Sequence, residues 1–428
     1  MAQPPIAIVG AGIGGLVLGR TLAKHAIPYV IYERLPSFKE YNYGITLSSR
    51  SLDTLSEVTG IKRAELISRV AVDNAIGGRG RVETRWPHKI IYNQEKDTIG
   101  SDDDLFFDCL RANRGNVESL LASGLNIQYG SVIHSIDTSS DTPIIEFSSK
   151  KSSDYAGALS AQHDIVIAAD GVHSAIRQSL LPAYKSRVAP IVAIYGKRRI
   201  PKEVLLDSNE WPKTRPAYMD FTIAGNNTDI NGDIKDAVTR ISVANSKDDS
   251  DTVDIEWVYS RPPARDDPLY KPHRSTEDSN IIHNRFFDEV RLLGPLKDAY
   301  PALWSRVFDV KGMKSDRMLS WLMRTVPVPP EGILRYLALK GVLFIGDSIH
   351  AEPIIGGQGY NNAIRDATVL AEKISRTGPS SNLGDFYIEL RKTWRNGVLS
   401  SERHLASIHN KRPFFVKEQR WFREKHNL

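Results

Sequence analysis

The residues best suited to chemistry are glycines and carboxylates that follow short apolar runs. Gly10, Gly12 and Gly15 come directly after IAIVG in GxGxxG spacing. The first glycine permits a tight turn, the second lets backbone approach a pyrophosphate, and the third lets a helix pack close to the strand. Glu33 ends the next apolar run, YVIYE, where a carboxylate can accept a hydrogen bond from an adenosine ribose. This pattern predicts a dinucleotide site but does not distinguish NAD from FAD.

Two further stretches place a carboxylate at the end of a buried run. IVIAADG carries Asp170 and Gly171, and GVLFIGD carries Asp347. In open α/β sheets ligands bind at the carboxyl ends of the strands, so these side chains are expected at one edge. A glycine-rich turn follows Asp347 and leads into a predicted helix. Its N–H groups are placed to face the pyrimidine oxygen of a flavin and to stabilise the charge gained on reduction.

The elements that must position these residues predict an α/β fold. Separated pieces build a Rossmann-type layer, a mostly antiparallel β-sheet is inserted between them, and helices close the chain. The family that the motifs resemble implies that the first is an FAD-binding layer and the inserted sheet a substrate layer. The segment DCLRANRGNVESLLASG is expected to start a helix, and further helices are expected over 360–377 and 386–410. The expected domains are 1–184 for the first part of the FAD-binding domain, 185–335 for the inserted sheet layer, 336–378 for the second FAD-binding part, and 379–428 for the C-terminal helices.

Composition excludes several classes of protein. The 428 residues are 41% hydrophobic and 25% charged, which is typical of a globular protein. The formal charge is 56 − 51 = +5, and no long Lys/Arg run is present, so nucleic-acid binding is not expected. Cys109 is the only cysteine, which excludes an intrachain disulfide and a cysteine-ligated cluster. No stretch reaches the roughly 20 apolar residues of a membrane span, and a cytoplasmic location is expected.

The three motifs together resemble those of the class A FAD-dependent aromatic hydroxylases, the family of para-hydroxybenzoate hydroxylase. GxGxxG, DG and GD occur in order, and the likeness covers nearly the whole chain, most strongly 1–40, 105–180 and 341–370. The resemblance implies non-covalent FAD, with NADPH or NADH as co-substrate. It further implies that reduced flavin and O2 form a C4a-hydroperoxide, whose distal oxygen passes to an electron-rich carbon of an aromatic or similar small organic substrate, a chemistry common in secondary metabolism.

The resemblance also implies residue roles. Glu33 matches the ribose-binding acid, Asp170–Gly171 the DG motif tied to FAD and transient NADPH use, and Asp347 the residue that binds the ribityl chain. Arg114 is similar to an arginine that contacts FAD, with Arg111 as the weaker match. The full set expected to bind the cofactor is Gly10, Gly12, Gly15, Glu33, Arg34, Gly44, Arg114, Asp170, Gly171, Asp347, Gly357, Gly359, Tyr360 and Asn361.

One departure from the family pattern leaves alternatives open. Family members usually read GDAAH with a proline four residues past the histidine, whereas this chain reads GDSIH and has Ile354 there. A second hypothesis is therefore an FAD-dependent oxidase, dehydrogenase or cyclase of the same fold without oxygen insertion. A third is a non-catalytic flavin-fold protein, which the intact DG and GD motifs disfavour.

The catalytic residues are predicted from the inserted layer, which faces the flavin in this family. A phenolic or β-dicarbonyl substrate needs a base, or a cation that favours its anion. The predicted catalytic residues are Tyr195, Arg198 and Tyr218, with Trp321 as a further lining residue, Asp220 as an alternative base and Arg50 as a residue approaching the flavin.

Two remaining patterns are interpreted as structural. His350 and Glu352 match the HxE half of a non-haem iron site, but they fall in the segment Asp347–Asn361 that the resemblance places at the flavin, the flavin loop, so no metal is expected. The tail from Lys411 mixes basic and aromatic residues, and packing on the core is favoured over peripheral membrane contact. The expected partners are a small organic substrate, O2 and NAD(P)H.

Overall fold

A computed structural model describes residues 6–82, 109–140, 142–149, 159–206, 217–223, 237–246, 250–275, 277–292, 301–379 and 381–409. The chain divides into two compact units. Unit 1 comprises 1–70, 112–187 and 324–399, and unit 2 comprises 71–111, 188–323 and 400–428. The tail from Lys411 lies outside the described residues.

Unit 1 is built on a parallel sheet, as expected for the Rossmann-type layer. Within the described part of the chain this sheet has five strands in the order β17-β9-β1-β2-β5. They are β1 (Ile6–Val9), β2 (Tyr29–Glu33), β5 (Ile127–Tyr129), β9 (Val166–Ala168) and β17 (Val342–Phe344). Every neighbouring pair runs parallel, and β1, β9 and β17 are buried throughout. Burial on both faces explains why these strands are continuous apolar runs.

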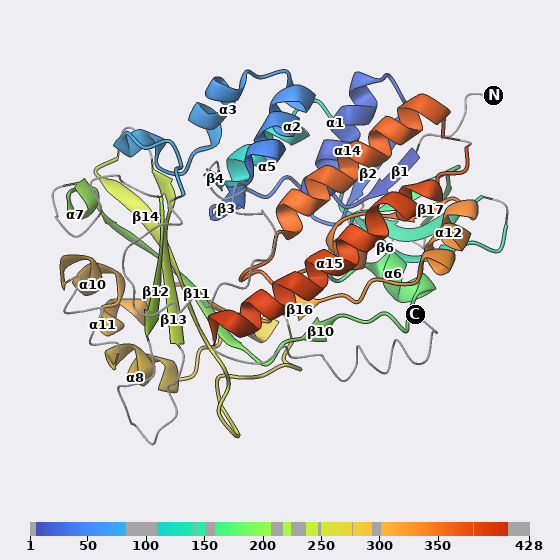
Figure 1. Cartoon of the computed structure of the whole chain (residues 1–428). Coiled ribbons are helices and arrows are strands. Elements are labelled where there is room, and N and C mark those ends of the chain that lie inside the picture. The colour runs from blue at the N-terminus through green and yellow to red at the C-terminus, as the bar shows by residue number, and fades with distance from the viewer. Residues whose placement is uncertain are drawn as a thin grey trace. The chain divides into compact units, whose positions relative to one another are not determined.

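Helices and a smaller sheet complete unit 1. The helices are α1 (Ile13–Lys24), α2 (Ser49–Thr59), α3 (Arg63–Val70), α5 (Arg114–Ala122), α6 (Ala175–Leu180), α12 (Glu331–Leu339), α13 (Asp347–His350), α14 (Gly359–Thr377) and α15 (Asp385–Ile408), the last continuing past Leu399. An antiparallel sheet joins β6 (Ser131–Asp137), β7 (Ile144–Ser149) and β8 (Leu159–Gln162), and β3 (Gly44–Leu47) precedes α2. Helices α1 and α14 pack side by side (Figure 1).

One expected helix begins later than its apolar pattern suggested. Residues Leu110–Asn113 form strand β4, and helix α5 starts only at Arg114. The side chain of Asn113 accepts a hydrogen bond from the Asn116 amide at 3.1 Å, which is an N-cap that fixes the helix start there. The expected helices near the C-terminus are confirmed as α14 and α15.

Unit 2 contains the expected antiparallel layer. Its described strands pair in the order β12-β13-β14-β11-β15. They are β11 (Val192–Pro201), β12 (Tyr218–Ile223), β13 (Ala237–Ser246), β14 (Thr252–Arg261) and β15 (Met318–Trp321). The helices are α7 (Glu203–Leu206), α8 (Arg285–Arg291), α10 (Pro301–Val307) and α11 (Val310–Met313), with 3₁₀ turns η1 (Asn74–Ile76) and η2 (Glu277–Asn280). Two short strands, β10 (Arg187–Val188) and β16 (Arg324–Thr325), lie near the boundaries between the units.

The two faces of the unit 2 sheet differ in chemistry. On one face Trp257 and Tyr259 pack against Phe286 of α8, and the Trp257 and Phe286 rings stack with centroids 5.7 Å apart. Helices α8, α10 and α11 lie along this side of the strands in Figure 1. Because side chains alternate along a strand, Glu256 and Val258 of β14 belong to the opposite face. The described helices of unit 2 therefore pack on the face that carries Trp257 and Tyr259, and not on the face that carries Glu256.

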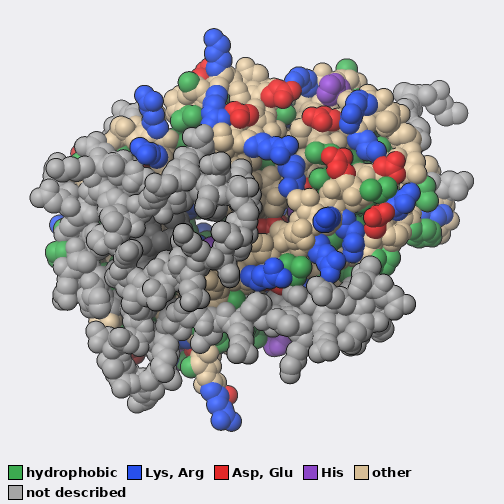
Figure 2. All heavy atoms as spheres, in the orientation of Figure 1, with side chains coloured by type: hydrophobic (Ala, Val, Ile, Leu, Met, Phe, Trp, Pro, Cys, Tyr) green, Lys and Arg blue, Asp and Glu red, His purple; other side chains and the backbone are tan. Residues whose placement is uncertain are grey.

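On the part of the surface that Figure 2 colours by residue type, Lys and Arg side chains are interspersed with Asp and Glu side chains. Among the described residues, no helix is both long and apolar enough to cross a membrane.

Candidate active site

The glycine turn after β1 has the geometry that its sequence predicts. Gly10 has φ +106°, a conformation that favours glycine, and a Cβ there would lie 2.6 Å from the Ala169 carbonyl oxygen. A Cβ added at Gly15 would lie 2.0 Å from the Gly10 carbonyl oxygen, so only glycine lets α1 pack this close. A Cβ added at Gly12 would meet no described atom within 4 Å. The turn is tight at both ends and open in the middle.

Glu33 lies beside this turn at the end of β2. Its Oε2 accepts a hydrogen bond from the Ala11 amide at 2.8 Å, and its Oε1 accepts one from the Leu35 amide at 2.9 Å. These bonds hold the Glu33 carboxylate at the carboxyl edge of the sheet. Ala11, which donates one of them, lies between Gly10 and Gly12 in the chain. The structure thus brings the predicted ribose acid to the predicted pyrophosphate turn.

Asp170 follows β9 and lies against the same turn. Its Oδ2 accepts a hydrogen bond from the Ala175 amide at 2.7 Å, and burial raises the pKa of the carboxyl. Gly171, next to it, has φ +76°. The fully buried Arg177 donates to the Ser348 carbonyl at 2.5 Å and to the Val172 carbonyl at 2.6 Å. This guanidinium therefore ties the DG segment to the GD segment.

Asp347 starts α13 beside the first residue of α14. A Cβ added at Gly359 would lie 3.0 Å from Asp347 Oδ1, which places the predicted ribityl ligand at the end of the flavin loop. Burial raises the pKa of Asp347, whereas the nearby His350 and arginines lower it. A Cβ at Gly357 would lie 2.3 Å from the Pro353 carbonyl oxygen, so the loop folds back on itself.

Asn361 joins the flavin loop to the start of α2. Its Nδ2 donates to the Thr46 carbonyl at 3.1 Å and its Oδ1 accepts from the Ser48 amide at 3.0 Å. Ser48 is the N-cap of α2, and Gly44 starts the strand that leads to it. The loop and the β3 segment are held together although they are more than 300 residues apart in the chain.

A buried acid–base network lies behind Asp347. His350 Nε2 and Asp366 Oδ2 are 2.5 Å apart, and both residues are fully buried. Asp366 also accepts hydrogen bonds from the Gly346 amide at 3.0 Å and from Trp394 Nε1 at 2.8 Å. Burial alone would raise the pKa of Asp366, but His350, Arg365 and the Trp394 hydrogen bond together lower it. Burial would likewise lower the pKa of His350, and Asp366 together with other carboxylates raises it. Each group of the pair therefore favours the charged form of the other.

Glu352 closes the flavin loop from inside. Its Oε2 accepts from the Gln358 amide at 2.6 Å and its Oε1 accepts from Asn362 Nδ2 at 2.6 Å. Both halves of the HxE pattern are therefore engaged in hydrogen bonds within unit 1. No group of three or more His, Cys, Asp or Glu side chains in the described part of the chain is placed to hold a metal.

Arg114 lies between two tyrosines rather than at the surface. Its guanidinium carbon is 4.1 Å from the Tyr41 ring centroid, its Nη1 donates to the Tyr43 hydroxyl, and its Nε donates to Glu118 at 2.8 Å. Glu118 is the largest influence raising the Arg114 pKa, which burial alone would lower. Burial raises the pKa of the Tyr360 hydroxyl well above its usual value, and the charges of Glu118 and Arg114 also act on this hydroxyl.

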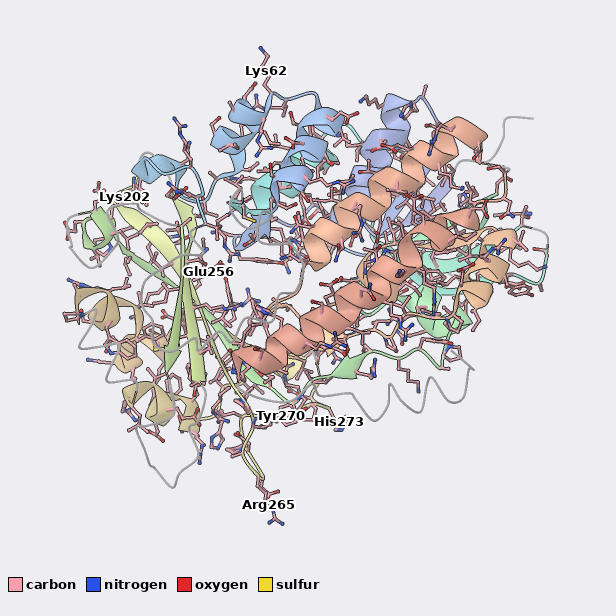
Figure 3. All side chains as sticks on the ribbon, viewed as in Figure 1. Lys62, Lys202, Glu256, Arg265, Tyr270 and His273 are labelled. Atoms are coloured by element: carbon pink, nitrogen blue, oxygen red, sulfur yellow. The ribbon has the colours of Figure 1, made fainter. Side chains whose placement is uncertain are left out.

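In unit 2 a second set of polar groups gathers on the sheet face opposite the helices. Glu256, 3% exposed, accepts hydrogen bonds from Ser242 at 2.7 Å and from Arg111. The Tyr195 hydroxyl lies 3.5 Å from Glu256 Oε2. The Tyr195 and Trp321 rings stack with centroids 4.6 Å apart and planes within 11°. Figure 3 labels Glu256, which projects from β14 on the side away from α8 and α10.

The FAD binding domain family matches residues 3–190 and 334–389 of the chain. The FAD-dependent monooxygenase adaC of Aspergillus niger is 30% identical over 420 residues, covering 95% of this chain and 94% of that protein. The chain belongs to the FAD-dependent monooxygenases.

Solved structures share the fold of this monooxygenase. A putative FAD-containing monooxygenase from Photorhabdus luminescens matches with a TM-score of 0.63 and 20% identity, covering 97% of this chain and all of that one. HpxO of Klebsiella pneumoniae, solved with FAD and uric acid, matches with a TM-score of 0.60 and 17% identity, covering 98% of this chain and 92% of that one. At these identities the likeness concerns the fold alone.

The residues of this monooxygenase fit the cofactor. Within the described residues, buried Asp170 Oδ1, Asp347 Oδ1 and the Tyr360 hydroxyl have no hydrogen-bond partner in the protein. Such orphaned groups are costly unless a ligand or water satisfies them. They lie near the glycine turn and the flavin loop, and Gly12 leaves room for a pyrophosphate. A ligand with a phosphate end and a polyhydroxylated chain meets these requirements.

Arg34 directly follows Glu33 at the end of β2 and is exposed, as is Arg50 on α2. Ile354 is 61% exposed on a flavin loop whose neighbouring side chains are buried. Arg198 donates to the Asp309 carbonyl at 3.1 Å and lies 3.5 Å from Asp316, beside α11, so it is not brought to Tyr195. Tyr218 pairs in register with Ser242, but the side chains of Tyr218 and Asp220 lie outside the described residues.

Sequence reasoning missed two members of the unit 2 cluster. Glu256 was not singled out, although a carboxylate inside the β-branched and aromatic run DIEWVYS signals a buried charge that needs a partner. Arg111 was weighed only as an FAD contact, because its pairing with a strand 145 residues away leaves no local signal.

Proposed function

We propose that this monooxygenase uses NADPH or NADH and O2 to hydroxylate or epoxidise an aromatic or otherwise electron-rich small molecule in fungal secondary metabolism. When bound, FAD supplies the redox chemistry that activates oxygen. The observation that carries the substrate class is the Tyr195–Trp321 stack beside the buried Glu256. An aromatic shelf next to a carboxylate and an arginine suits a planar phenol.

The chain's own residues would then divide the work. The Tyr195 and Trp321 rings hold the substrate by stacking and exclude water from it. The Tyr195 hydroxyl accepts the phenolic proton while passing its own toward Glu256, 3.5 Å away. Arg111 and Ser242 hold that carboxylate in place. Loss of the phenolic proton makes the ring carbon more nucleophilic, which favours attack on an electrophilic oxygen.

The test begins with the purified protein, which is expected to be yellow and to release FAD on denaturation. NADPH and NADH consumption is then measured with a panel of phenols, naphthols and anthrones, and with β-dicarbonyl compounds as the non-aromatic arm. A substrate that stimulates consumption is turned over under ¹⁸O₂. One ¹⁸O atom in the product is the expected result.

Other outcomes contradict the proposal in different ways. An oxidised or cyclised product without label would indicate the oxidase, dehydrogenase or cyclase alternative, for which the exposed Ile354 on the flavin loop leaves room. Bound FAD without any substrate-stimulated consumption of NAD(P)H would favour a non-catalytic flavin protein.

A further inference from the structure

The C-terminal helix α15 reaches the flavin motif through one indole. Trp394 is buried, and its Nε1 donates to Asp366 Oδ1 at 2.8 Å. The Trp394 ring also stacks on His350, with centroids 4.7 Å apart and planes within 22°. One residue of α15 therefore contacts both partners of the buried ion pair.

Asp366 passes this restraint to the turn before Asp347. While Oδ1 is held by Trp394, Oδ2 accepts from the Gly346 amide at 3.0 Å and lies 2.5 Å from His350 Nε2. Gly346 has φ +59°, a conformation that requires glycine and sets where Asp347 begins α13. The carboxylate thus receives bonds from three residues in two segments, the α13 turn and α15, and its orientation fixes the turn.

We propose that Trp394 is a positioning residue for FAD, acting through Asp366 and Gly346 on the placement of Asp347. The proposal rests on FAD binding by the family and is independent of the substrate proposed above. Without the indole N–H, Asp366 loses the hydrogen bond to its Oδ1, so its orientation is less restrained and the Gly346–Asp347 turn is held less firmly. The expected consequence is weaker FAD binding at the site of Asp347, beyond any general loss of stability.

The chain offers a matched control on the same helix. The Tyr387 hydroxyl accepts a hydrogen bond from the Phe344 amide at 3.0 Å, and Tyr387 is buried. Tyr387→Phe therefore removes one buried hydrogen bond between α15 and β17, as Trp394→Phe removes one between α15 and α14. The Tyr387 bond holds the backbone of β17 two residues before Gly346, whereas the Trp394 bond reaches the Gly346 amide itself through Asp366.

The experiment strips FAD from the full-length protein and titrates it back by fluorescence quenching. Trp394→Phe is expected to raise the Kd for FAD about tenfold, as for loss of a buried hydrogen bond to a charged group. Trp394→His keeps a ring N–H and is expected to stay within about threefold of the wild type. Tyr387→Phe should lower the melting temperature comparably and leave the Kd within about twofold. At saturating FAD the visible circular dichroism of the flavin should change only in Trp394→Phe.

The outcomes distinguish the role of Trp394 from FAD binding by the protein as such. If Trp394→Phe leaves the Kd unchanged, or if Tyr387→Phe raises it by the same factor, Trp394 is only a packing residue. If Trp394→Phe does not fold, the Trp394→His variant decides the outcome. A Trp394→His variant that folds but has a Kd for FAD about ten times that of the wild type also overturns the role of the N–H. A wild-type protein that takes up no FAD would instead contradict the cofactor assignment itself.

Discussion

The Gly15 Cα lies so close to the Gly10 carbonyl that a Cβ on Gly15 would stand 2.0 Å from that oxygen. Helix α1 and the end of β1 therefore meet backbone to backbone. Gly12, only three residues away, faces open space. Two glycines of one motif thus have different duties, since one serves the packing of the protein and the other serves the ligand.

Alanine substitutions should separate these duties. Gly15→Ala is expected to destabilise the FAD-free protein by about 1–3 kcal/mol or to prevent folding, because the Cβ must displace backbone. Gly12→Ala should leave the melting temperature of the FAD-free protein nearly unchanged and weaken FAD binding at least about tenfold, because its Cβ occupies pyrophosphate space. Thermal unfolding and FAD titration of both variants provide the measurement. Equal losses of stability would show that Gly12 also serves packing.

Asp347 is predicted to hold the cofactor. Its orphaned Oδ1 needs a donor, and a ribityl hydroxyl supplies one. Asp347→Ala should lose most of the bound flavin, with a Kd raised by a factor of about ten or more. Flavin content per protein, read from the visible spectrum, is the measurement. Glu372→Ala, an exposed change on α14, serves as the control and should retain a full complement. Retention of flavin by the Asp347 variant would remove this carboxylate from the site.

Glu256 and Glu289 allow the substrate face of unit 2 to be tested against its packed face. Each is a buried carboxylate bonded to an arginine, Arg111 for Glu256 and Arg261 for Glu289. Glu256→Gln should lower kcat/KM for the substrate at least about tenfold with normal FAD content. Glu289→Gln should lower stability and leave kcat/KM nearly unchanged. Steady-state NAD(P)H oxidation and thermal unfolding decide between these outcomes, and a normal kcat/KM in the Glu256 variant would exclude it from catalysis.

The His350–Asp366 pair predicts a pH dependence of stability. The pKa of His350 is raised on folding, so its stabilising contribution is complete below about pH 6.5 and is lost as pH rises through the folded pKa. The pKa of Asp366 is lowered, so its contribution is present above about pH 3.9 and is lost as pH falls through the folded pKa. The pair should stabilise most between about pH 4 and pH 6.5.

Thermal unfolding of the FAD-free wild type and of His350→Gln measures this effect. The difference in melting temperature between them should shrink from pH 6 to pH 9. Asp347 and Glu352 also favour the charged imidazole, so Asp366→Asn should reduce the dependence without abolishing it. A difference that grows with pH would mean that His350 is neutral in the folded protein.

Local patterns were sufficient to predict the cofactor unit. The strand–glycine–helix pattern placed Gly10, Gly12 and Gly15, and the carboxylates that end β9 and β17 are found at the expected edge of the sheet. These positions depend on neighbours in the chain and on the rule for parallel sheets. Tyr195 could be proposed in the same way, from its place on an alternating strand.

The remaining features depend on contacts between distant segments. Trp394 appeared only as one apolar residue of an amphipathic helix, and its bond to Asp366 spans 28 residues. The Arg111–Glu256 pair spans 145 residues. The engagement of Arg198 with Asp309 depends on which face of β11 the helices cover, and the alternation of β11 alone allows either face.

The parallel sheet of unit 1 also has a temporal consequence. Its strand order β17-β9-β1-β2-β5 places the latest strand at one edge, beside a strand that precedes it by more than 170 residues. During synthesis the glycine turn emerges first, yet Asp347 and Asn361 leave the ribosome only after all of the unit 2 sheet. The chain therefore cannot assemble a complete flavin site until the whole of the unit 2 sheet has been synthesised, and complete capture of FAD must follow the synthesis of that sheet.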